Sequence, residues 1–589
     1  MLGTLVKGWL RSMMCRLSQL NLGKTVISSP KRGNQITLPA LLIVLFTFTA
    51  YLMSIPPHFK SGFVAYPDAL YLLSVDFYIS SVVWLLLIFG VIWYSCSVNR
   101  RYIYSLLVVV ISIVFYGYWV VNSPFIYGPD GFYFNEISQY FLSSNSISVS
   151  KDLSYSQWPG FFVLQTFLIR VIGNEIVAHK ILSLILFLSL SLVFYHWLKL
   201  ATDHKLAFLG FLLFIQANLR LNSKPYASPY SLCLVFFLIL LIIISKIPKK
   251  KGINIPVTML ILGSSIIISH LITSIYLISL LGMYYFFAKN RKRNNYSLYL
   301  IVLLVSWLTF YTFPGYIINI STFISGSIAQ TFESPWFMHY LKQTSGEQLP
   351  PWVTVQRLTV SLTVIFLSSI WILQFMKKSI SRRSFFKTLE RQSLDIKIAL
   401  SFVLGILILS VPSLLYKAGE VSYYIWLFSL FPLCFLAAKA LAPHKNAVTA
   451  LTAVFLLLLP VSFISNYYNV NTYIVREPEL AGAEFIGDCK DMSIVTDFST
   501  KQILSYFSSY AQFETTSWNP MVNPKTEFLR RLRAGNIQGD LFFYSLRTKY
   551  ILRMLHGFDD LDLEALNRNM NNLTNRIYDN GIVNIFAEN

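Results

Sequence analysis

The segment YIYSLLVVVISIVFYGYWVV (residues 102–121), followed closely by IYGPDGFYFNEISQYFLSS (residues 126–144), decides how this sequence folds. The first part is apolar over about 20 residues, the length that an α-helix needs to cross the hydrocarbon core of a bilayer. The second part begins with a Pro-Asp-Gly turn and then becomes aromatic and amphipathic. The pair predicts a membrane helix that ends beside an acidic group, Asp130.

Apolar runs of similar length recur along the chain. Of its 589 residues, 55% are hydrophobic and only 13% are charged, whereas a soluble domain carries about 25% charged residues. The pattern predicts an all-α polytopic membrane protein with about thirteen transmembrane helices. The predicted spans are about 38–55, 78–96, 102–121, 178–197, 206–219, 230–245, 256–270, 272–288, 298–317, 358–376, 397–415, 423–441 and 447–465.

Lysine and arginine are distributed unevenly between the connecting segments. One alternate set, which includes the N-terminus, holds 27 of them, and the other set holds 8. Positive charge accumulates on the cytoplasmic side, beside the anionic leaflet. We therefore expect a cytoplasmic basic N-terminus (1–37), a transmembrane domain (38–465) and an extracytoplasmic soluble domain (466–589) of a multi-pass cell-membrane protein. Most of the net charge of +21 is therefore explained by basic residues that face anionic membrane lipid. We do not expect nucleic acid as a partner.

Two predicted outer segments are long, 122–177 and 318–357. Within the first, residues 132–142 alternate apolar and polar side chains at helical spacing: Phe134, Ile137, Tyr140 and Phe141 against Asn135, Glu136, Ser138 and Gln139. A second such piece, 156–173, has Pro159 where a first helical turn tolerates proline. Aromatic helices with one apolar face just outside a span are typical of the membrane interface, so we expect two interfacial helices here.

The C-terminal segment has the pattern of a small α/β domain. It predicts a helix, a short strand at Ser493–Thr496, and a further helix. The last residues, NRIYDNGIVNIFAEN (575–589), place an Asn-Gly pair between two apolar runs, which favours a tight hairpin turn.

Charged and polar residues gather at the predicted outer ends of several spans. Such groups are costly near the hydrocarbon core and usually face a cavity, so each is a candidate site residue. The candidates are Asp130 after the third span, Arg220 and Lys224 between the fifth and sixth, His270 between the seventh and eighth, and Lys417 and Glu420 between the eleventh and twelfth. The predicted orientation rests on lysine and arginine in the inner segments. The placement of all these candidates on the outer side is therefore an independent indication that they belong to one site.

Each candidate also has a structural interpretation. Asp130 could cap the helix that follows it, because aspartate accepts hydrogen bonds from free N–H groups of a first turn. The others could be side chains reaching lipid headgroups (Arg220, Lys224), a hydrogen-bonded turn histidine (His270) and a surface ion pair (Lys417, Glu420).

An acid and several cations at one membrane face suit transfer from a lipid-bound phosphate. Breaking a glycosyl–phosphate bond calls for a base that deprotonates the acceptor hydroxyl, a role open to Asp or Glu. Cations hold the departing phosphate, arginine through paired donors and lysine as a point charge. The five cysteines have no metal-binding spacing. We assign no metal ligands, although a divalent metal would be compatible with the reaction.

The order of these segments resembles the GT-C superfamily of membrane glycosyltransferases, especially archaeal members that use polyprenyl-phosphate sugars such as dolichyl-phosphate mannose. The resemblance runs from about residue 100 to the C-terminus, so the first two spans precede it. It is carried by YGPDGFYFNEI, QWPGFFVL, SKPYASPYSLCL, SHLITS, AGEVSYY and NRIYDNGIVNIF.

The resemblance implies that Asp130 is the catalytic base. It also implies a set of donor phosphate contacts, namely Arg220, Lys224, His270 and Lys417. The family often has a second acidic residue nearby, and both Glu136 and Asp152 are candidates for it here. Relatives often carry an arginine after the glutamate of the late loop, but Val421 follows Glu420, which puts a phosphate role there in doubt.

The activity implied is transfer of a sugar from a polyprenyl (dolichyl) phosphate to a lipid-linked glycan, a protein or a surface polymer on the outer face. The alternative is a transporter or flippase of lipid-linked sugars, which would need charged or helix-breaking residues near the bilayer midplane. The predicted spans carry few of these away from their ends. A polysaccharide polymerase or ligase is a third interpretation, chemically close to the first.

Overall fold

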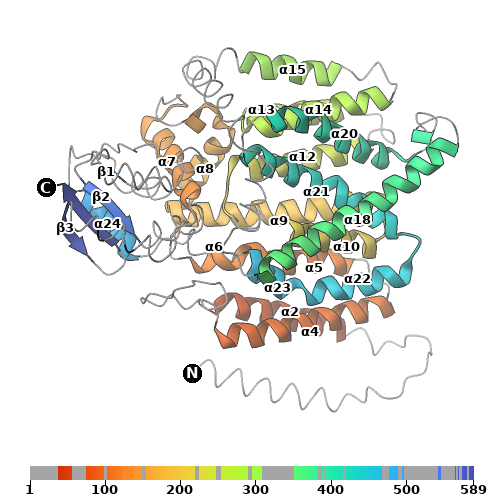
Figure 1. Ribbon diagram of the computed structural model, residues 1–589, viewed down its shortest axis with the longest axis horizontal. Helices are drawn as coiled ribbons and strands as arrows, with labels where there is room; N and C mark the ends of the chain where they lie inside the picture. Colours follow the sequence, from red (N-terminus) through yellow and green to blue (C-terminus); the bar gives the residue numbers. More distant parts are fainter. Residues whose placement is uncertain are drawn as a thin grey trace, which may run out of the picture.

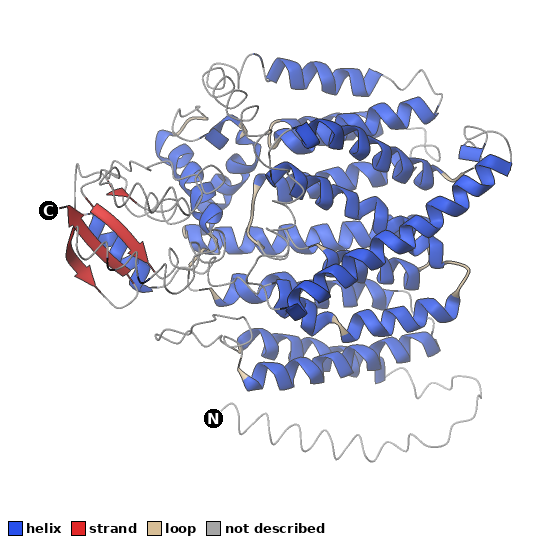
Figure 2. Ribbon diagram, in the orientation of Figure 1, coloured by secondary structure: helices blue, strands red, loops and turns tan. Residues whose placement is uncertain are grey.

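The computed structural model shows a bundle of helices with a four-stranded sheet at one end (Figure 1). Figure 2 shows how far helix dominates the described part of the chain. The structure describes residues 37–55, 74–98, 102–123, 125–126, 128–147, 154–218, 225–246, 254–288, 295–307, 309, 351–381, 388–389, 392–415, 419–466, 477–487, 494–495, 541–545, 564, 568, 574–579 and 583–588. Four predicted site residues lie outside these ranges: Asp152, Arg220, Lys224 and Lys417.

The N-terminal part forms an antiparallel pair, α2 (Thr37–Ser54) and α4 (Val75–Val98), packed beside a third apolar segment. That third segment is not one regular helix. It runs as α5 (Tyr102–Ser112), a π-helical turn η2 (Ile113–Gly117) and α6 (Tyr118–Asn122). A Cβ atom added at Gly117 would lie 3.0 Å from Leu184 Cδ2 and 3.1 Å from Met53 Cε, so glycine permits close packing of neighbouring helices there.

Successive helices of the described chain form the middle of the bundle. They are α9 (Glu175–Ala201), α10 (His204–Ala217), α12 (Pro229–Lys246), α13 (Asn254–Ile267), α14 (Leu271–Ala288) and α15 (Asn295–Trp307). Side-chain caps fix two of the starts. Asn174 accepts a hydrogen bond from Val177 N at 3.0 Å, and Asp203 accepts one from Leu206 N at 2.8 Å. These caps satisfy amide groups that a helix start leaves without partners.

The remaining helices of the bundle are α18 (Pro351–Ser381), α20 (Leu394–Leu415), α21 (Gly419–Leu441), α22 (Lys445–Leu457) and α23 (Leu459–Asn466). In Figure 1, α18 runs obliquely across the others. The predicted span 447–465 is a broken helix, because α22 and α23 meet at an angle of 46°. Pro460 lies in the first turn of α23, where its missing N–H costs no helical hydrogen bond.

Five helices in the described ranges are long and apolar enough to cross a bilayer: Val75–Ile92, Tyr102–Asn122, Glu175–Ala201, Trp352–Ser381 and Tyr424–Leu441. The bent pair would make a sixth. Each other predicted span falls on a shorter apolar helix. The helices expose large apolar side chains such as Leu86 (64%) and Phe366 (66%), as lipid-facing surfaces do. The chain is therefore a membrane protein, whereas thirteen crossings remains a prediction.

Aromatic side chains fill much of the interior. The ring of Phe431 on α21 lies 5.4 Å from that of Phe194 on α9 and 5.1 Å from that of Phe214 on α10. Trp197 stacks on Phe435 with ring centroids 5.1 Å apart. Rings of this size supply much of the packing attraction between helices. This is important because a bilayer offers little hydrophobic driving force between them.

Several buried polar groups inside the bundle are hydrogen-bonded across helices. Gln356 Nε2 on α18 donates to Ser462 Oγ on α23 at 2.6 Å, and that hydroxyl donates to Gln216 Oε1 on α10 at 2.9 Å. Beside them, Arg357 Nη2 donates to the Ser465 carbonyl oxygen at 2.5 Å. Hydrogen bonds of this kind hold membrane helices together where apolar contacts alone are not specific.

The sheet at the end of the bundle has the order β1-β2-β4-β3. Its elements are β1 (Ile494–Val495), β2 (Leu541–Ser545), β3 (Thr574–Asp579) and β4 (Val583–Glu588), and α24 (Glu477–Gly487) packs against β4. β1 runs parallel to β2, and the other pairs are antiparallel. The predicted β3–β4 pairing and the strand near residue 494 are confirmed. The helix predicted after that strand lies outside the described residues, and a separate α/β domain stays a prediction.

Candidate functional site

Two helices lie at the same end of the bundle as the sheet, α7 (Pro129–Ser144) and α8 (Pro159–Ile172), preceded by a short 3-10 helix, η3 (Ser154–Gln157) (Figure 1). Helix α7 begins at Gly128, whose φ of 85° favours glycine, and continues with Pro129 in its first turn. Gly128 is therefore the N-cap residue, and Asp130 already lies within the helix. The interpretation of Asp130 as the capping residue is wrong.

The polar residues predicted to form one face of α7 are buried or half-buried in the structure. Asn135 and Ser138 are buried, contrary to expectation. The reason is that α8 supplies polar partners: Gln165 Nε2 donates to Asn135 Oδ1 at 3.0 Å, and Thr166 Oγ1 donates to the Ser138 carbonyl oxygen at 3.1 Å. Both predicted helices exist, but their place at the membrane interface remains a prediction.

The carboxylate of Asp130 is half-buried and accepts a hydrogen bond at Oδ2 from the hydroxyl of Tyr226. Tyr226 is buried, and it lies in the short segment that leads into α12. That segment is bound to α9, since Ala227 N donates to Ser183 Oγ at 2.7 Å. Tyr226 lies within SKPYASPYSLCL but was not among the predicted site residues. A tyrosine beside proline in an outer segment with cations was the available signal.

A histidine of α9 lies directly under the first turn of α7. A Cβ atom at Gly131 would be 3.4 Å from His179 Nε2 and 2.7 Å from Ile126 Cγ2. His179 is buried, and its Nδ1 lies 3.0 Å from Gln165 Nε2. Among the described residues, His179 Nε2 has no hydrogen-bond partner. Sequence reasoning missed His179 because it falls inside an apolar run.

The predicted site residue His270 lies in the turn between α13 and α14 and is buried. Thr273 N donates to His270 Nδ1 at 3.3 Å, so Nδ1 is an acceptor and a neutral ring carries its proton on Nε2. That Nε2 faces the hydroxyl of Tyr424 at 3.5 Å. The rings of Tyr230 and Tyr424 lie 6.3 Å and 5.5 Å from the His270 ring. His270 is thus both a hydrogen-bonded turn residue and a member of an aromatic cluster.

The start of α8 is packed against the turn that carries His270. Gly160 N donates to the Ile268 carbonyl oxygen at 3.1 Å, and a Cβ atom at Gly160 would lie 2.2 Å from Ser269 Oγ. Helix α8 also supplies Gln165 beneath α7. The two centres, Asp130 with Tyr226 and His270 with its tyrosines, are therefore connected through one helix.

The other acidic residues lie on α7, α21 and α9. Glu136 is half-buried on α7, six residues after Asp130, so the two positions are roughly 120° apart around the helix axis. Glu420 precedes Tyr424 by one helical turn on α21, which puts both positions on one side of the helix. Glu175, which sequence reasoning did not name, accepts a hydrogen bond from Gln139 Nε2 of α7. Within the described ranges, no group of three or more His, Cys, Asp or Glu residues is arranged to hold a metal.

No protein-family model matches this sequence, and no curated protein matches it either. Its structure is similar to that of ArnT from Cupriavidus metallidurans in the apo state, at 12% identity and a TM-score of 0.47 over 84% of this chain and 98% of that one. For ArnT from the same organism bound to undecaprenyl phosphate, the identity is 12% and the TM-score is 0.45, over 82% of this chain and 97% of that one. For the oligosaccharyltransferase from Archaeoglobus fulgidus in the apo form, the identity is 10% and the TM-score is 0.44, over 83% of this chain and 74% of that one. Similarities of this size support no conclusion about chemistry.

Proposed function

We propose that this protein is a membrane glycosyltransferase that transfers a sugar from a polyprenyl-phosphate donor to an acceptor hydroxyl. The observation that carries the proposal is the half-buried carboxylate of Asp130, which accepts a hydrogen bond from the Tyr226 hydroxyl. A carboxylate kept near the bilayer has a cost that function can explain. The sequence resemblance to GT-C enzymes assigns the same residue as the base.

In the proposed reaction, Asp130 removes the proton from the acceptor hydroxyl as its oxygen attacks the anomeric carbon of the donor. The bond from that carbon to the phosphate oxygen breaks, and polyprenyl phosphate leaves with the electron pair. A base acts well only when it is held within hydrogen-bond reach of the proton it takes. The contribution of Tyr226 is to fix the orientation of the carboxylate.

Arg220 and Lys224 are the proposed partners of the donor phosphate. Lys224 is two residues from Tyr226 in the sequence, and two residues of extended chain span at most about 7 Å. A cation so close in sequence to the tyrosine that holds the base is well suited to bind the leaving phosphate. His270 and Lys417 are proposed as further phosphate contacts, and Glu420 as an additional site residue.

The finer features of the proposal come from the resemblance. They are a dolichyl-type donor, an acceptor that is a lipid-linked glycan, a protein or a surface polymer, and an archaeal type of enzyme. The N-terminus is proposed to be cytoplasmic and residues 466–589 extracytoplasmic. In support of a common side, the sheet and α7 lie at the same end of the bundle (Figure 1).

The flippase alternative receives less support. Such a protein would need charged groups where a span is broken near the midplane. The break between α22 and α23 is formed by Leu458, Leu459 and Pro460, which are all apolar.

The decisive experiment uses the full chain in vesicles that contain a polyprenyl-phosphate sugar. An enzyme consumes the donor and releases polyprenyl phosphate, whereas a flippase moves the donor without breaking it. Asp130→Asn is expected to lower turnover roughly 10²–10⁴-fold, the usual contribution of a general base, while donor binding is kept. Wild-type turnover in that variant would show that Asp130 is not the base. Donor that stays intact with wild-type protein across a panel of sugars would contradict the enzyme class.

A further inference from the structure

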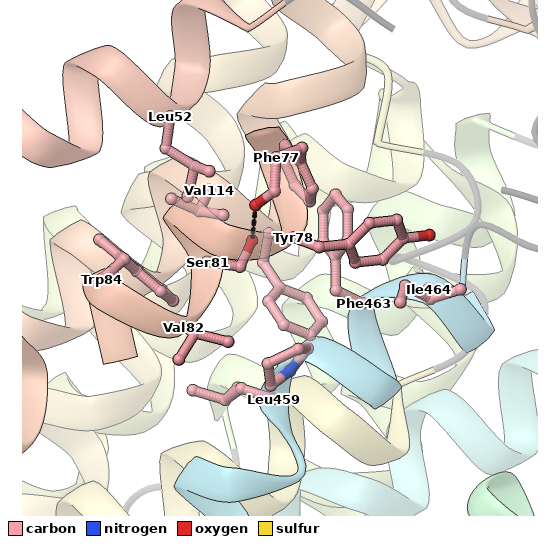
Figure 3. A pocket seen from close by; sticks show the side chains of 12 residues that line it. Leu52, Phe77, Tyr78, Ser81, Val82, Trp84, Val114, Leu459, Phe463 and Ile464 are labelled. Atoms are coloured by element: carbon pink, nitrogen blue, oxygen red, sulfur yellow. Dashed lines mark hydrogen bonds between the residues drawn. The ribbon is translucent and has the colours of Figure 1, made fainter. Parts of the chain in front are cut away.

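A cavity of about 120 Å³ lies between α4, η2 and α23 (Figure 3). It is lined by the α2–α4 pair, which precedes the part of the sequence that resembles glycosyltransferases, and by core helices. In Figure 1, α6 and α9 lie between α4 and α7, which carries Asp130. The cavity is therefore separate from the candidate site.

The walls of the cavity are almost entirely apolar. The hydroxyl of Ser81 is used within its own helix, because its Oγ donates to the Phe77 carbonyl oxygen at 2.8 Å. A buried water needs two to four polar partners, and these walls do not supply them. The natural content of the cavity is hydrocarbon.

Two irregular helices shape the cavity. Val114 and Phe115 on one wall belong to the π-helical turn, and Leu459 and Pro460 on another directly follow the 46° bend. A π-helical turn is a rare feature that is found frequently at functional sites. Sharp bends arise from a local cause such as a proline. Phe463 of α23 closes the inner side, with its ring 6.4 Å from that of buried Trp119 and nearly parallel to it. The hollow is thus built by backbone deviations in two separate segments.

The rim of the cavity belongs to a lipid-facing surface. Val82 lines the cavity and is 56% exposed, while Pro460 opposite it is half-buried. Val82 continues a stripe of exposed apolar residues on α4 that includes Ile79 and Leu86. A lipid chain that lies along this stripe would meet the cavity from the side.

We propose that this cavity binds one acyl chain of a bilayer phospholipid and so joins the α2–α4 pair to the core. An apolar cavity of about 150 Å³ accepts benzene, so a hollow of about 120 Å³ accepts a short stretch of hydrocarbon. The chain of the sugar donor is not the occupant, because its phosphate must reach Asp130 beyond α6 and α9.

The test uses full-length protein in vesicles of phosphatidylcholine and phosphatidylglycerol, with a phosphatidylcholine that carries a diazirine in one acyl chain. After irradiation and digestion, mass spectrometry locates the adducts. We expect them to concentrate on peptides containing residues 75–84 and 459–464 and to decrease when unlabelled phospholipid is added. The labelling needs no sugar transfer, so it is independent of the proposed activity.

A matched pair of variants sharpens the test. Val82→Trp places a large ring over the rim and is expected to reduce labelling of these peptides several-fold. Leu86→Trp makes the same change one turn further along the stripe and is expected to leave the labelling unchanged. Equal labelling in the two variants, or adducts spread evenly over exposed helices such as α18, would overturn the proposal. So would displacement of the probe by polyprenyl phosphate but not by phospholipid.

Discussion

The hydroxyl of Tyr226 donates a hydrogen bond to Oδ2 of Asp130, although 96 residues separate the two in the sequence. The partners come from different structural elements. Asp130 lies in the first turn of α7, and Tyr226 lies in a segment bound to α9 through the Ser183 hydroxyl. The orientation of the proposed base therefore depends on α7, α9 and the approach to α12 together.

Removing the Tyr226 hydroxyl is the first prediction. Hydrogen bonds to charged groups contribute about 1.5–3 kcal/mol, so Tyr226→Phe is expected to lower kcat for sugar transfer roughly 10–100-fold. The KM for the donor is expected to stay unchanged, because the hydroxyl acts on the base. Steady-state kinetics in vesicles measure both constants. Tyr299→Phe, on an exposed part of α15, is the control. A raised KM with normal kcat would instead assign Tyr226 to donor binding.

The contact between Gly131 and His179 gives the second prediction. Alanine is ordinarily favoured over glycine inside a helix by about 1 kcal/mol. Here the added Cβ would lie 2.7 Å from Ile126 Cγ2 and 3.4 Å from His179 Nε2, so Gly131→Ala must shift the turn that carries Asp130. We expect a lower melting temperature together with lower turnover.

The control for this change lies on α4. A Cβ atom at Gly90 would meet nothing within 4 Å, so Gly90→Ala is expected to be neutral or to stabilise the protein by up to about 1 kcal/mol. Thermal unfolding in detergent compares the two variants. If both raise the melting temperature, the close approach at Gly131 does not constrain α7.

The third prediction concerns the amide that joins three helices. Gln165 Nε2 contacts Asn135 Oδ1 and His179 Nδ1, each at 3.0 Å. Gln165→Met keeps most of the volume but leaves two buried polar atoms without this partner, which costs about 1–3 kcal/mol. We expect this cost to appear as a lower melting temperature in thermal unfolding. A second variant, Asn135→Leu, tests the coupling, because its effect should be smaller in the Gln165→Met background than in the wild type.

Much of the helical architecture could be predicted from sequence because a bilayer leaves little choice. Backbone groups in hydrocarbon must be satisfied within the segment, so long apolar runs form helices. The β3–β4 pairing followed from equally local information, the Asn-Gly pair between two apolar runs. The π-helical turn at Ile113–Gly117 and the bend before Leu459 were not predicted. Both occur within continuous apolar sequence, where periodicity carries no signal for them.

The contacts around the candidate site residues could not be predicted from the sequence. Asp130 and His270 were singled out by their charge or type at span ends, but their partners Tyr226 and Tyr424 were not. Asn135 and Ser138 were assigned to a polar face, yet both are buried. In each case the decisive contact comes from a residue far away in the chain, such as Gln165 or Thr166 for α7. Spacing along one helix cannot reveal such partners.

The fourth prediction tests whether α8 connects the two centres. A Cβ atom at Gly160 would lie 2.2 Å from Ser269 Oγ, next to His270. Gly160→Ala must therefore push α8 away from this turn, and α8 also carries Gln165 beneath α7. We expect the variant to lose both thermal stability and turnover. Adding Ser269→Ala removes the nearest obstructing atom, so the double variant should recover part of both losses, with Ser269→Ala alone as the control. Partial rather than full recovery is expected because Ile268 Cγ1 would still lie 3.1 Å from the new methyl group. If the second change restores neither property, the contact between α8 and the His270 turn is not what holds the two centres together.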